Sequence, residues 1–389
     1  MMTAEQRKQV EGLIPVIEAI PLLGGRFEKL AHVPVRRGGT FSIVFKAWDV
    51  AAGKHVLVKF FNFVTTPSSS PRADLFRHEP TILKALIGSR RCLQLVEGLA
   101  EHSVALMTPA GFPLTITAQY FVTEWLEGDI LEQFFDRERF SPEDRLKLFV
   151  NIVLAVRALH TKEVVHRDLK VDNLMERLDE LKRVIVAIDM GCAAIVSAGP
   201  RLSAYDYPVG FKPYSPPEAH CGLAGIHAIG HKTDVYALGC LLFELFNAEE
   251  YAMAFLRHNP SRLLTLNAMC DYVRDAHDDA ARISQWALAL RLFAAGFTPI
   301  DIDGPGSSIP TGVVDIVNEV MRSMTDVDYR RRPSLDRVVQ RIQIAIKVLG
   351  NQRYEQERRA RILKQRKVRE DNQRQKDIRV KALTKPSAA

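Results

Sequence analysis

Short apolar runs, some of them alternating with polar residues, mark the first third of the chain. Residues 36–47 have the pattern of two strands joined by a tight glycine turn, and residues 56–61 form an apolar run rich in valine and phenylalanine. Residues 120–127 alternate as a half-buried strand does, and the alternation ends at Gly128. These patterns predict strands.

Farther along the chain the apolar spacing becomes helical. Ser141 is a candidate N-cap, Pro142 would occupy the first helical position, and acidic residues follow at once. The apolar residues that follow share one face of this predicted helix: Leu146, Phe149, Val150 and Val153. Residues 247–311 contain a further amphipathic stretch and are interpreted only as helices and connections.

Lys59 is the only charged residue within the apolar run at residues 56–61. An ammonium group among such neighbours needs a partner that offsets its desolvation. The alternative is a lysine on an edge strand whose stem is covered while its charge reaches water. The run alone does not decide between a functional and a surface lysine.

Two nearby segments carry charged and chelating side chains at short spacing. Residues 165–173 contain Asp168, Lys170 and Asn173, and Asp189 follows them. A carboxylate can accept a hydroxyl proton, an ammonium can reach a phosphate, and hard oxygen ligands suit magnesium. Phosphoryl transfer needs these groups, because it depends on positioning and charge neutralisation rather than on covalent chemistry by the protein.

The order and spacing of these segments resemble the catalytic loop and metal-binding turn of protein kinases. The resemblance implies an α+β, two-lobed protein kinase fold with a small β-rich N-lobe and a larger helical C-lobe. It divides the chain into an N-terminal extension (1–25), the N-lobe (26–125), the C-lobe (126–350) and a basic tail (351–389). The tail is expected to be partly helical or disordered.

The resemblance also assigns roles to individual residues. Asp168 is expected to accept the proton of the substrate hydroxyl, Lys170 to contact the transferring phosphate, and Asn173 and Asp189 to bind Mg²⁺. Lys59 would hold the phosphates of ATP. The residues expected at the nucleotide are Gly38, Gly39, Val44, Leu57, Lys59, Glu124, Leu126, Asp129 and Met175. The implied substrate is a protein, with serine or threonine favoured over tyrosine because of Lys170.

Glu79 lies where the family places the glutamate that pairs with the phosphate-binding lysine, so it joins the expected catalytic residues. Pro80 opposes this role, because proline disfavours helical conformation in the residue before it. We therefore expect the helix to start or kink at Pro80, which leaves open whether Glu79 is directed at Lys59. The alternative is a surface carboxylate in the first turn of a helix.

Four residues depart from the family pattern: Arg37, Ser42, Pro80 and Phe211. Arg37 and Ser42 replace two glycines of the phosphate-binding loop, and on its own that loop resembles an ordinary β-hairpin turn. These departures support an alternative function, a nucleotide-binding pseudokinase that acts as a scaffold. Retention of Asp168 argues against it, because a module that only binds needs no proton acceptor.

Residues beyond the metal-binding turn resemble an activation segment that ends near Glu218. The family pairs this glutamate with an arginine at the position of Arg332, and it anchors the catalytic loop with an aspartate at the position of Asp234. The candidate phosphorylation sites in this segment are Ser197, Ser203, Tyr205 and Tyr207. The implied kinase activity includes autophosphorylation. A phosphate there could pair with Arg167.

The composition, with 389 residues and 47% hydrophobic content, fits a globular enzyme with extensions. The five cysteines form no paired framework and favour a reducing compartment, so we expect a cytoplasmic protein without a transmembrane segment. One group invites a zinc interpretation: His220, Cys221, His227 and His231. Its spacing matches no familiar zinc site, so solvated loop histidines are preferred.

Positive charge is concentrated in the tail. Residues 351–389 contain 13 Lys or Arg and 5 Asp or Glu, a net charge of +8, whereas the whole chain carries +7. The remaining 350 residues therefore carry about −1. The tail is predicted to be a solvated extension, with an acidic protein, nucleic acid or an anionic membrane surface as possible partners.

Overall fold

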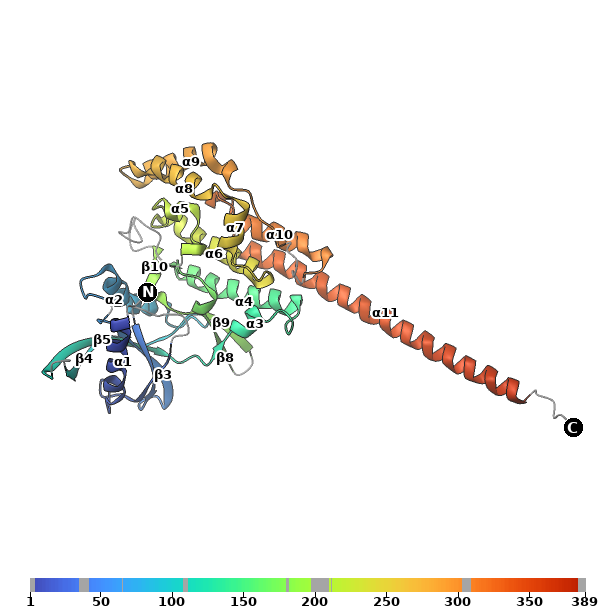
Figure 1. Ribbon diagram of the computed structural model, residues 1–389, viewed down its shortest axis with the longest axis horizontal. Helices are drawn as coiled ribbons and strands as arrows, with labels where there is room; N and C mark the ends of the chain where they lie inside the picture. The colour runs from blue at the N-terminus through green and yellow to red at the C-terminus, as the bar shows by residue number, and fades with distance from the viewer. Residues whose placement is uncertain are drawn as a thin grey trace.

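The chain folds into a sheet-based N-lobe and a helical C-lobe, from which one long helix projects (Figure 1). This fold is seen in a computed structural model, which describes residues 4–34, 42–64, 66–107, 111–179, 182–196, 210, 212–302 and 309–383. The α+β fold class predicted from the sequence is confirmed.

The N-lobe is built on an antiparallel sheet of five strands in the order β1-β2-β3-β5-β4. Its strands are β1 (Phe27–His32), β2 (Ser42–Asp49), β3 (Lys54–Phe61), β4 (Leu95–Met107) and β5 (Pro113–Glu124). In the central strands Val44 lies opposite Lys59, and Leu57 lies opposite Thr123. Successive side chains of a strand point to opposite faces, so Val44, Leu57 and Lys59 share one face.

Helix α1 (Ala4–Glu18) covers the other face of this sheet. Leu13 and Ile17 are buried in the same apolar cluster as Val56 and Val58, the residues of β3 that alternate with Leu57 and Lys59. The N-terminal residues, expected only as an extension, thus complete the core of the N-lobe.

Helix α2 (Pro71–Leu86) corrects the prediction for Pro80. The helix begins nine residues earlier, where Ser70 Oγ accepts a hydrogen bond from Ala73 N at 3.3 Å, and it continues through Pro80. Only one backbone donor is lost at an internal proline. The buried apolar residues on both sides of Pro80, including Phe76 and Leu83, keep the helix packed against the sheet.

The C-lobe consists mainly of helices, and Ser141 and Pro142 begin α4 as predicted, with Ser141 Oγ accepting from Asp144 N at 3.2 Å. Its α-helices are α3 (Leu131–Phe135), α4 (Pro142–Thr161), α5 (Pro217–His220), α6 (His227–Phe246), α7 (Tyr251–His258), α8 (Arg262–Arg274), α9 (Asp279–Phe293), α10 (Thr311–Met324) and α11 (Leu335–Leu383). A large apolar cluster extends from α2 through α4 and α6 to α11.

Short strands lie where the two lobes meet, and 3-10 turns lie there and farther into the C-lobe. The strands are β6 (Gly128–Asp129), β7 (Val164–Val165), β8 (Leu174–Asp179), β9 (Lys182–Ala187) and β10 (Ala194–Ile195). They pair as β6-β8-β9 and as β7-β10. The 3-10 turns are η1 (Val171–Asn173), η2 (Met190–Cys192), η4 (Lys212–Tyr214), η5 (Ala294–Gly296) and η6 (Tyr329–Arg331).

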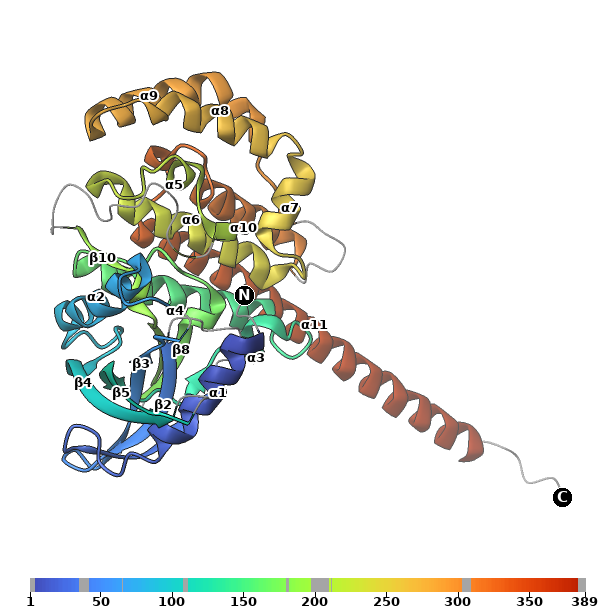
Figure 2. The same cartoon turned by 60° about the vertical axis from the view of Figure 1, so that its left-hand side comes forward.

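Helix α11 starts among the C-lobe helices and then leaves the body of the protein, as both orientations show (Figures 1 and 2). It packs against α4 and α10 and crosses residue 350, where the C-lobe was expected to end. The side chains at residues 353–370 are exposed. Within the described residues, none of the helices is long and apolar enough to cross a membrane.

Candidate active site

A cluster of three charged side chains lies between the sheet and the C-lobe. Lys59 Nζ donates to Glu79 Oε1 at 3.0 Å, to Glu79 Oε2 at 2.8 Å and to Asp189 Oδ1 at 2.8 Å. Lys59 comes from β3, Glu79 from α2, and Asp189 from the turn before η2. The structure therefore forms the Lys59–Glu79 pair despite Pro80, which answers the question that the sequence left open.

The electrostatics of this cluster follow from burial and from mutual attraction. Burial alone would lower the pKa of Lys59, but the carboxylates of Asp189 and Glu79 outweigh it and raise that pKa. Burial raises the pKa of Glu79 to about 7, against the opposing effect of Lys59. The charge of Lys59 lowers the pKa of Asp189. Lys59 is thus held as a cation that faces both carboxylates.

Glu79 also orders the turn that carries Asp189. Its Oε1 accepts from the backbone N of Met190 at 3.1 Å, and only 3% of its side chain is exposed. Asp189 has a φ of 60°, a conformation that non-glycine residues adopt rarely and mostly at functional sites. Its side chain is 48% exposed, so this carboxylate is accessible to a ligand.

The catalytic loop brings Asp168, Lys170 and Asn173 together. Asn173 Nδ2 donates to both the backbone O and Oδ2 of Asp168, each at 2.8 Å, and Lys170 Nζ lies 3.4 Å from the same Oδ2. Asp168 and Asn173 are largely buried. These contacts hold Oδ2 of Asp168 in place.

His166 joins the catalytic loop to the segment before Asp189. Its Nδ1 accepts from Asp168 N at 3.2 Å, and its Nε2 donates to the carbonyl of Ile188 at 3.0 Å. The amide can only donate and the carbonyl can only accept, so this geometry assigns the neutral tautomer with hydrogen on Nε2. The ring thereby ties the proposed proton acceptor to the proposed metal ligand.

Asp234 anchors the same loop from α6, as predicted. Its Oδ2 accepts from His166 N and from His160 Nε2, and its Oδ1 accepts from Arg167 N, all at 2.8 Å. Burial alone would raise the pKa of Asp234, but the hydrogen bond from His160 and the backbone donors lower it. The participation of His160 was not predicted, because its contact with Asp234 depends on how α4 packs against α6.

The residues expected at the nucleotide base fall along the junction of the lobes. Asp129 lies opposite Met175 in the β6–β8 pair. Leu126 is buried, and Glu124 pairs with Arg177 through its side chain. The backbone N of Glu124 donates to Gln94 O at 3.0 Å, and its carbonyl accepts from Thr123 Oγ1 at 3.3 Å. Gly38 and Gly39 lie outside the described residues.

The activation segment, residues 192–218, reaches the catalytic loop at Gly210. Gly210 has a φ of 89°, and a β-carbon there would lie 2.3 Å from Arg167 O and 3.0 Å from Asp168 Oδ1. Arg167 itself donates from Nε to Cys192 O at 2.7 Å. The requirement for glycine was missed, because it arises from a tertiary contact. The predicted phosphorylation sites and Phe211 lie outside the described residues.

Glu218 and Arg332 form a fully buried ion pair, as predicted. Arg332 uses two nitrogens to contact both carboxylate oxygens, with Nη2 to Oε2 at 2.9 Å. Arg332 also donates from Nη1 to Lys232 O at 2.9 Å, and Lys232 Nζ donates to Arg332 O at 2.6 Å. This network fixes the end of the activation segment to α6.

The residues considered for zinc do not gather around one point. Among the described residues, no group of three or more His, Cys, Asp or Glu side chains is arranged to hold a metal ion. His227 and His231 lie in α6 rather than in the expected loop. Burial lowers the pKa of His220 and of His231 to about 4, so both imidazoles are neutral at neutral pH.

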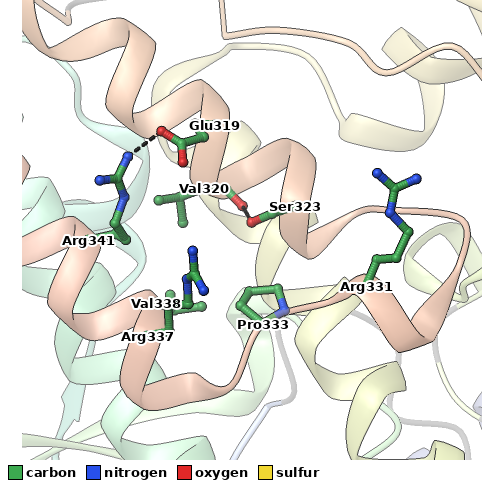
Figure 3. A pocket seen from close by; sticks show the side chains of 8 residues that line it. All are labelled: Glu319, Val320, Ser323, Arg331, Pro333, Arg337, Val338 and Arg341. Atoms are coloured by element: carbon green, nitrogen blue, oxygen red, sulfur yellow. Dashed lines mark hydrogen bonds and ion pairs between the residues drawn. The ribbon is translucent and has the colours of Figure 1, made fainter.

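A pocket of about 210 Å³ lies apart from these residues, between α10 and α11 (Figure 3). Three of its lining residues are arginines: Arg331, Arg337 and Arg341. Its one lining carboxylate, Glu319, pairs with Arg341. The pocket is therefore basic and contains none of the catalytic-loop residues.

Comparison with known sequences agrees with this geometry. The sequence model of the family described as protein kinase domain matches residues 38–344. The match covers more than half of the 389-residue chain, so the protein belongs to the protein kinase domain family. The family predicted from the sequence is confirmed.

Several curated relatives are named serine/threonine-protein kinases, and one of Dictyostelium discoideum, 27% identical over 55% of this chain, is named a dual specificity protein kinase. A probable serine/threonine-protein kinase of Streptomyces coelicolor is 28% identical over 57% of this chain, and PrkC of Bacillus subtilis is 26% identical over 61%. Serine/threonine-protein kinase nekl-2 of Caenorhabditis elegans is 27% identical over 44%. The matched regions span 30%, 33% and 51% of these relatives, respectively.

Proposed function

We propose that this protein transfers the γ-phosphoryl group of MgATP to serine or threonine hydroxyls of protein substrates, including its own activation segment. The observation that carries the proposal is the simultaneous contact of Lys59 Nζ with Glu79 and Asp189, beside the ordered loop that presents Asp168. A protein that only bound nucleotide would not need Asp168 positioned for proton transfer. This arrangement favours a catalyst over a pseudokinase scaffold.

The donor groups of the site fit a magnesium nucleotide. Asn173 uses Nδ2 for both of its hydrogen bonds to Asp168, which leaves its amide oxygen as a hard ligand. Asp189 is held through Oδ1 and is half exposed, so its other oxygen can bind a metal. When bound, Mg²⁺ would neutralise charge on the phosphates. Lys59 is the candidate cation for the nucleotide phosphates.

Residues of the catalytic loop would accept the proton of the acceptor hydroxyl and neutralise charge on the transferring phosphate. Asp168 Oδ1 would accept the hydroxyl proton, while Asn173 and Lys170 keep Oδ2 in place. Lys170, within 3.4 Å of Asp168, carries a positive charge that can face the transferring phosphate. His166 and Asp234 hold the loop backbone, so that little reorganisation is needed at the moment of transfer.

The experiment that tests this function uses the purified full chain, γ-labelled ATP, magnesium and a mixture of protein substrates. We expect label on serine or threonine, and Asp168→Asn should lose most transfer while it still binds MgATP, because an amide cannot accept the proton. Asp189→Ala should instead weaken metal-dependent nucleotide binding. MgATP binding without any transfer in the wild-type protein would identify a pseudokinase and overturn the proposal.

The protein substrate and the partner of the basic tail remain proposals. The exposed, positively charged part of α11 is suited to an acidic protein surface, nucleic acid or an anionic membrane. Titration with salt separates such binding from contacts made by the kinase domain, because attraction to the tail weakens as ionic strength rises.

A further inference from the structure

Two cysteines that are far apart in the sequence lie in direct contact in the C-lobe. Cys221 follows α5, Cys270 lies in α8, and their Sγ atoms are 3.0 Å apart. Both are free thiols. Helices α5 and α8 are in contact, and α5 lies beside α8 in both orientations (Figures 1 and 2).

We propose that Cys221 and Cys270 form a reversible intramolecular disulfide when the protein meets a hydroperoxide. A disulfide has an S–S distance of about 2.05 Å, so the two sulfurs need to approach each other by only about 1 Å. The sulfurs already face each other, and neither helix has to unfold for the bond to form.

The environment distinguishes the two thiols. Cys221 is buried, whereas Cys270 is partly exposed. The hydrogen bond between them lowers the pKa of Cys270 against the opposing effect of burial, and the same hydrogen bond raises the pKa of Cys221. Because Cys270 is the more exposed of the two, it is the thiol that an oxidant reaches, and Cys221 is the thiol that resolves the oxidised sulfur.

The oxidation proceeds in two steps and consumes one hydrogen peroxide. The Cys270 thiolate attacks one oxygen of hydrogen peroxide, an S–O bond forms, the O–O bond breaks, and the departing hydroxide takes up a proton. Cys221 then attacks the sulfenic sulfur of Cys270, an S–S bond forms, the S–O bond breaks, and the hydroxide leaves with the Cys221 proton. Two thiols are oxidised, and one peroxide is reduced to two waters.

The cross-link would fasten the end of the activation segment to α8. Cys221 lies three residues after Glu218, whose ion pair with Arg332 already fixes this end to α6. Arg282 of α9 also donates to Gly222 O at 3.5 Å. A disulfide would add a covalent link between segments separated by 49 residues, which restricts the unfolded chain and stabilises the fold.

The thiol chemistry is tested on the purified full chain with hydrogen peroxide as the probe, independently of phosphoryl transfer. We expect the number of free thiols to fall from five to three, a single cross-linked peptide that contains Cys221 and Cys270, and a rise in Tm that dithiothreitol reverses. Retention of both thiols, or oxidation of Cys270 to a sulfinic acid without the cross-link, would overturn the proposal.

Serine variants test the order of the steps. In Cys221→Ser, Cys270 should be trapped as a sulfenic acid that a dimedone probe labels, whereas Cys270→Ser should show no label at Cys221. Label at Cys221 in Cys270→Ser would overturn the assigned roles. Cys92→Ser is the matched control. Cys92 donates a hydrogen bond to Ser89 and not to either cysteine of the pair, so this variant should still form the cross-link. The Tm of each reduced variant verifies that it is folded.

Discussion

Gly210 lies so close to Arg167 that a β-carbon at residue 210 would be 2.3 Å from the carbonyl oxygen of Arg167. The same β-carbon would lie 3.0 Å from Asp168 Oδ1, the oxygen proposed to accept the proton of the substrate hydroxyl. Gly210 therefore packs closely against the backbone of the catalytic loop, and this contact has no room for a side chain at residue 210.

Gly210→Ala should lower kcat by about a hundredfold, since the methyl group displaces the catalytic loop by a fraction of an ångström or more. Gly88→Ala is the matched control: Gly88 has a similar φ of 80°, but a β-carbon there meets nothing within 4 Å. Both variants should lose about 1 kcal/mol or more of stability from backbone strain. Steady-state kinetics and thermal unfolding separate the effects, and equal activities in the two variants would contradict the role of Gly210.

Glu79→Gln should lower kcat/KM by about tenfold to a hundredfold, because hydrogen bonds to charged groups contribute about 1.5–3 kcal/mol. Pro80→Ala should leave the activity unchanged, since the structure already forms the Lys59–Glu79 pair with proline in place. A clear gain of activity in Pro80→Ala, absent when residue 79 is glutamine, would show that proline weakens the pair in solution. Phosphorylation assays on the three variants supply the measurement.

Activity should fall as the pH is lowered through about 7, because burial raises the pKa of Glu79 to about 7 and protonation removes the charge that holds Lys59. Below that pKa the loss should level off near the activity of Glu79→Gln, about tenfold to a hundredfold below the wild type. Profiles of kcat/KM against pH should therefore differ between the wild type and Glu79→Gln.

The contribution of Glu79 to the free energy of unfolding should change with pH in the direction opposite to the activity. The folded-state pKa of Glu79 lies above its ordinary value of 4.5, so the folded chain binds this proton more tightly than the unfolded chain. This contribution to stability is complete below pH 4.5 and is lost as the pH rises through about 7. Thermal unfolding at a series of pH values should show the loss in the wild type and not in Glu79→Gln; identical curves would contradict the assignment.

Arg332→Met should lower the free energy of unfolding by about 3–5 kcal/mol, because it leaves the fully buried carboxylate of Glu218 without its partner. Arg330→Met provides a close control, since Arg330 pairs with Asp328 but is 53% exposed. Arg330→Met should lower the free energy of unfolding by only about 0–1 kcal/mol. Denaturant unfolding of both variants tests the difference, and similar losses would show that burial of the Arg332 pair has little energetic effect.

The sequence predicted those parts of the site whose residues are close in the chain or belong to a family-wide pattern. Asp168, Lys170 and Asn173 lie within one short loop, so their proximity follows from local geometry alone. The pairing of Glu218 with Arg332 joins remote segments and was predicted only through the family resemblance.

The features that the sequence did not predict correctly all depend on tertiary packing. The local preference of Pro80 predicted a helix start, but the upstream cap at Ser70 and buried apolar neighbours carry α2 through it. Helix α1 carries Leu13 and Ile17 at helical spacing, and only its packing on the sheet shows that it belongs to the N-lobe core. The close approach at Gly210 depends on two segments that no local pattern connects.

The helical state of the tail has a geometric consequence for anything bound at its end. At about 1.5 Å per residue, the part of α11 from Asn351 to Leu383 is about 50 Å long. A helix of this kind acts as a semi-rigid spacer, whereas the end of a disordered segment could fold back toward Asp168. A partner held near Leu383 would therefore be kept away from Asp168, and phosphorylation would favour large or extended partners over small ones bound at the same place.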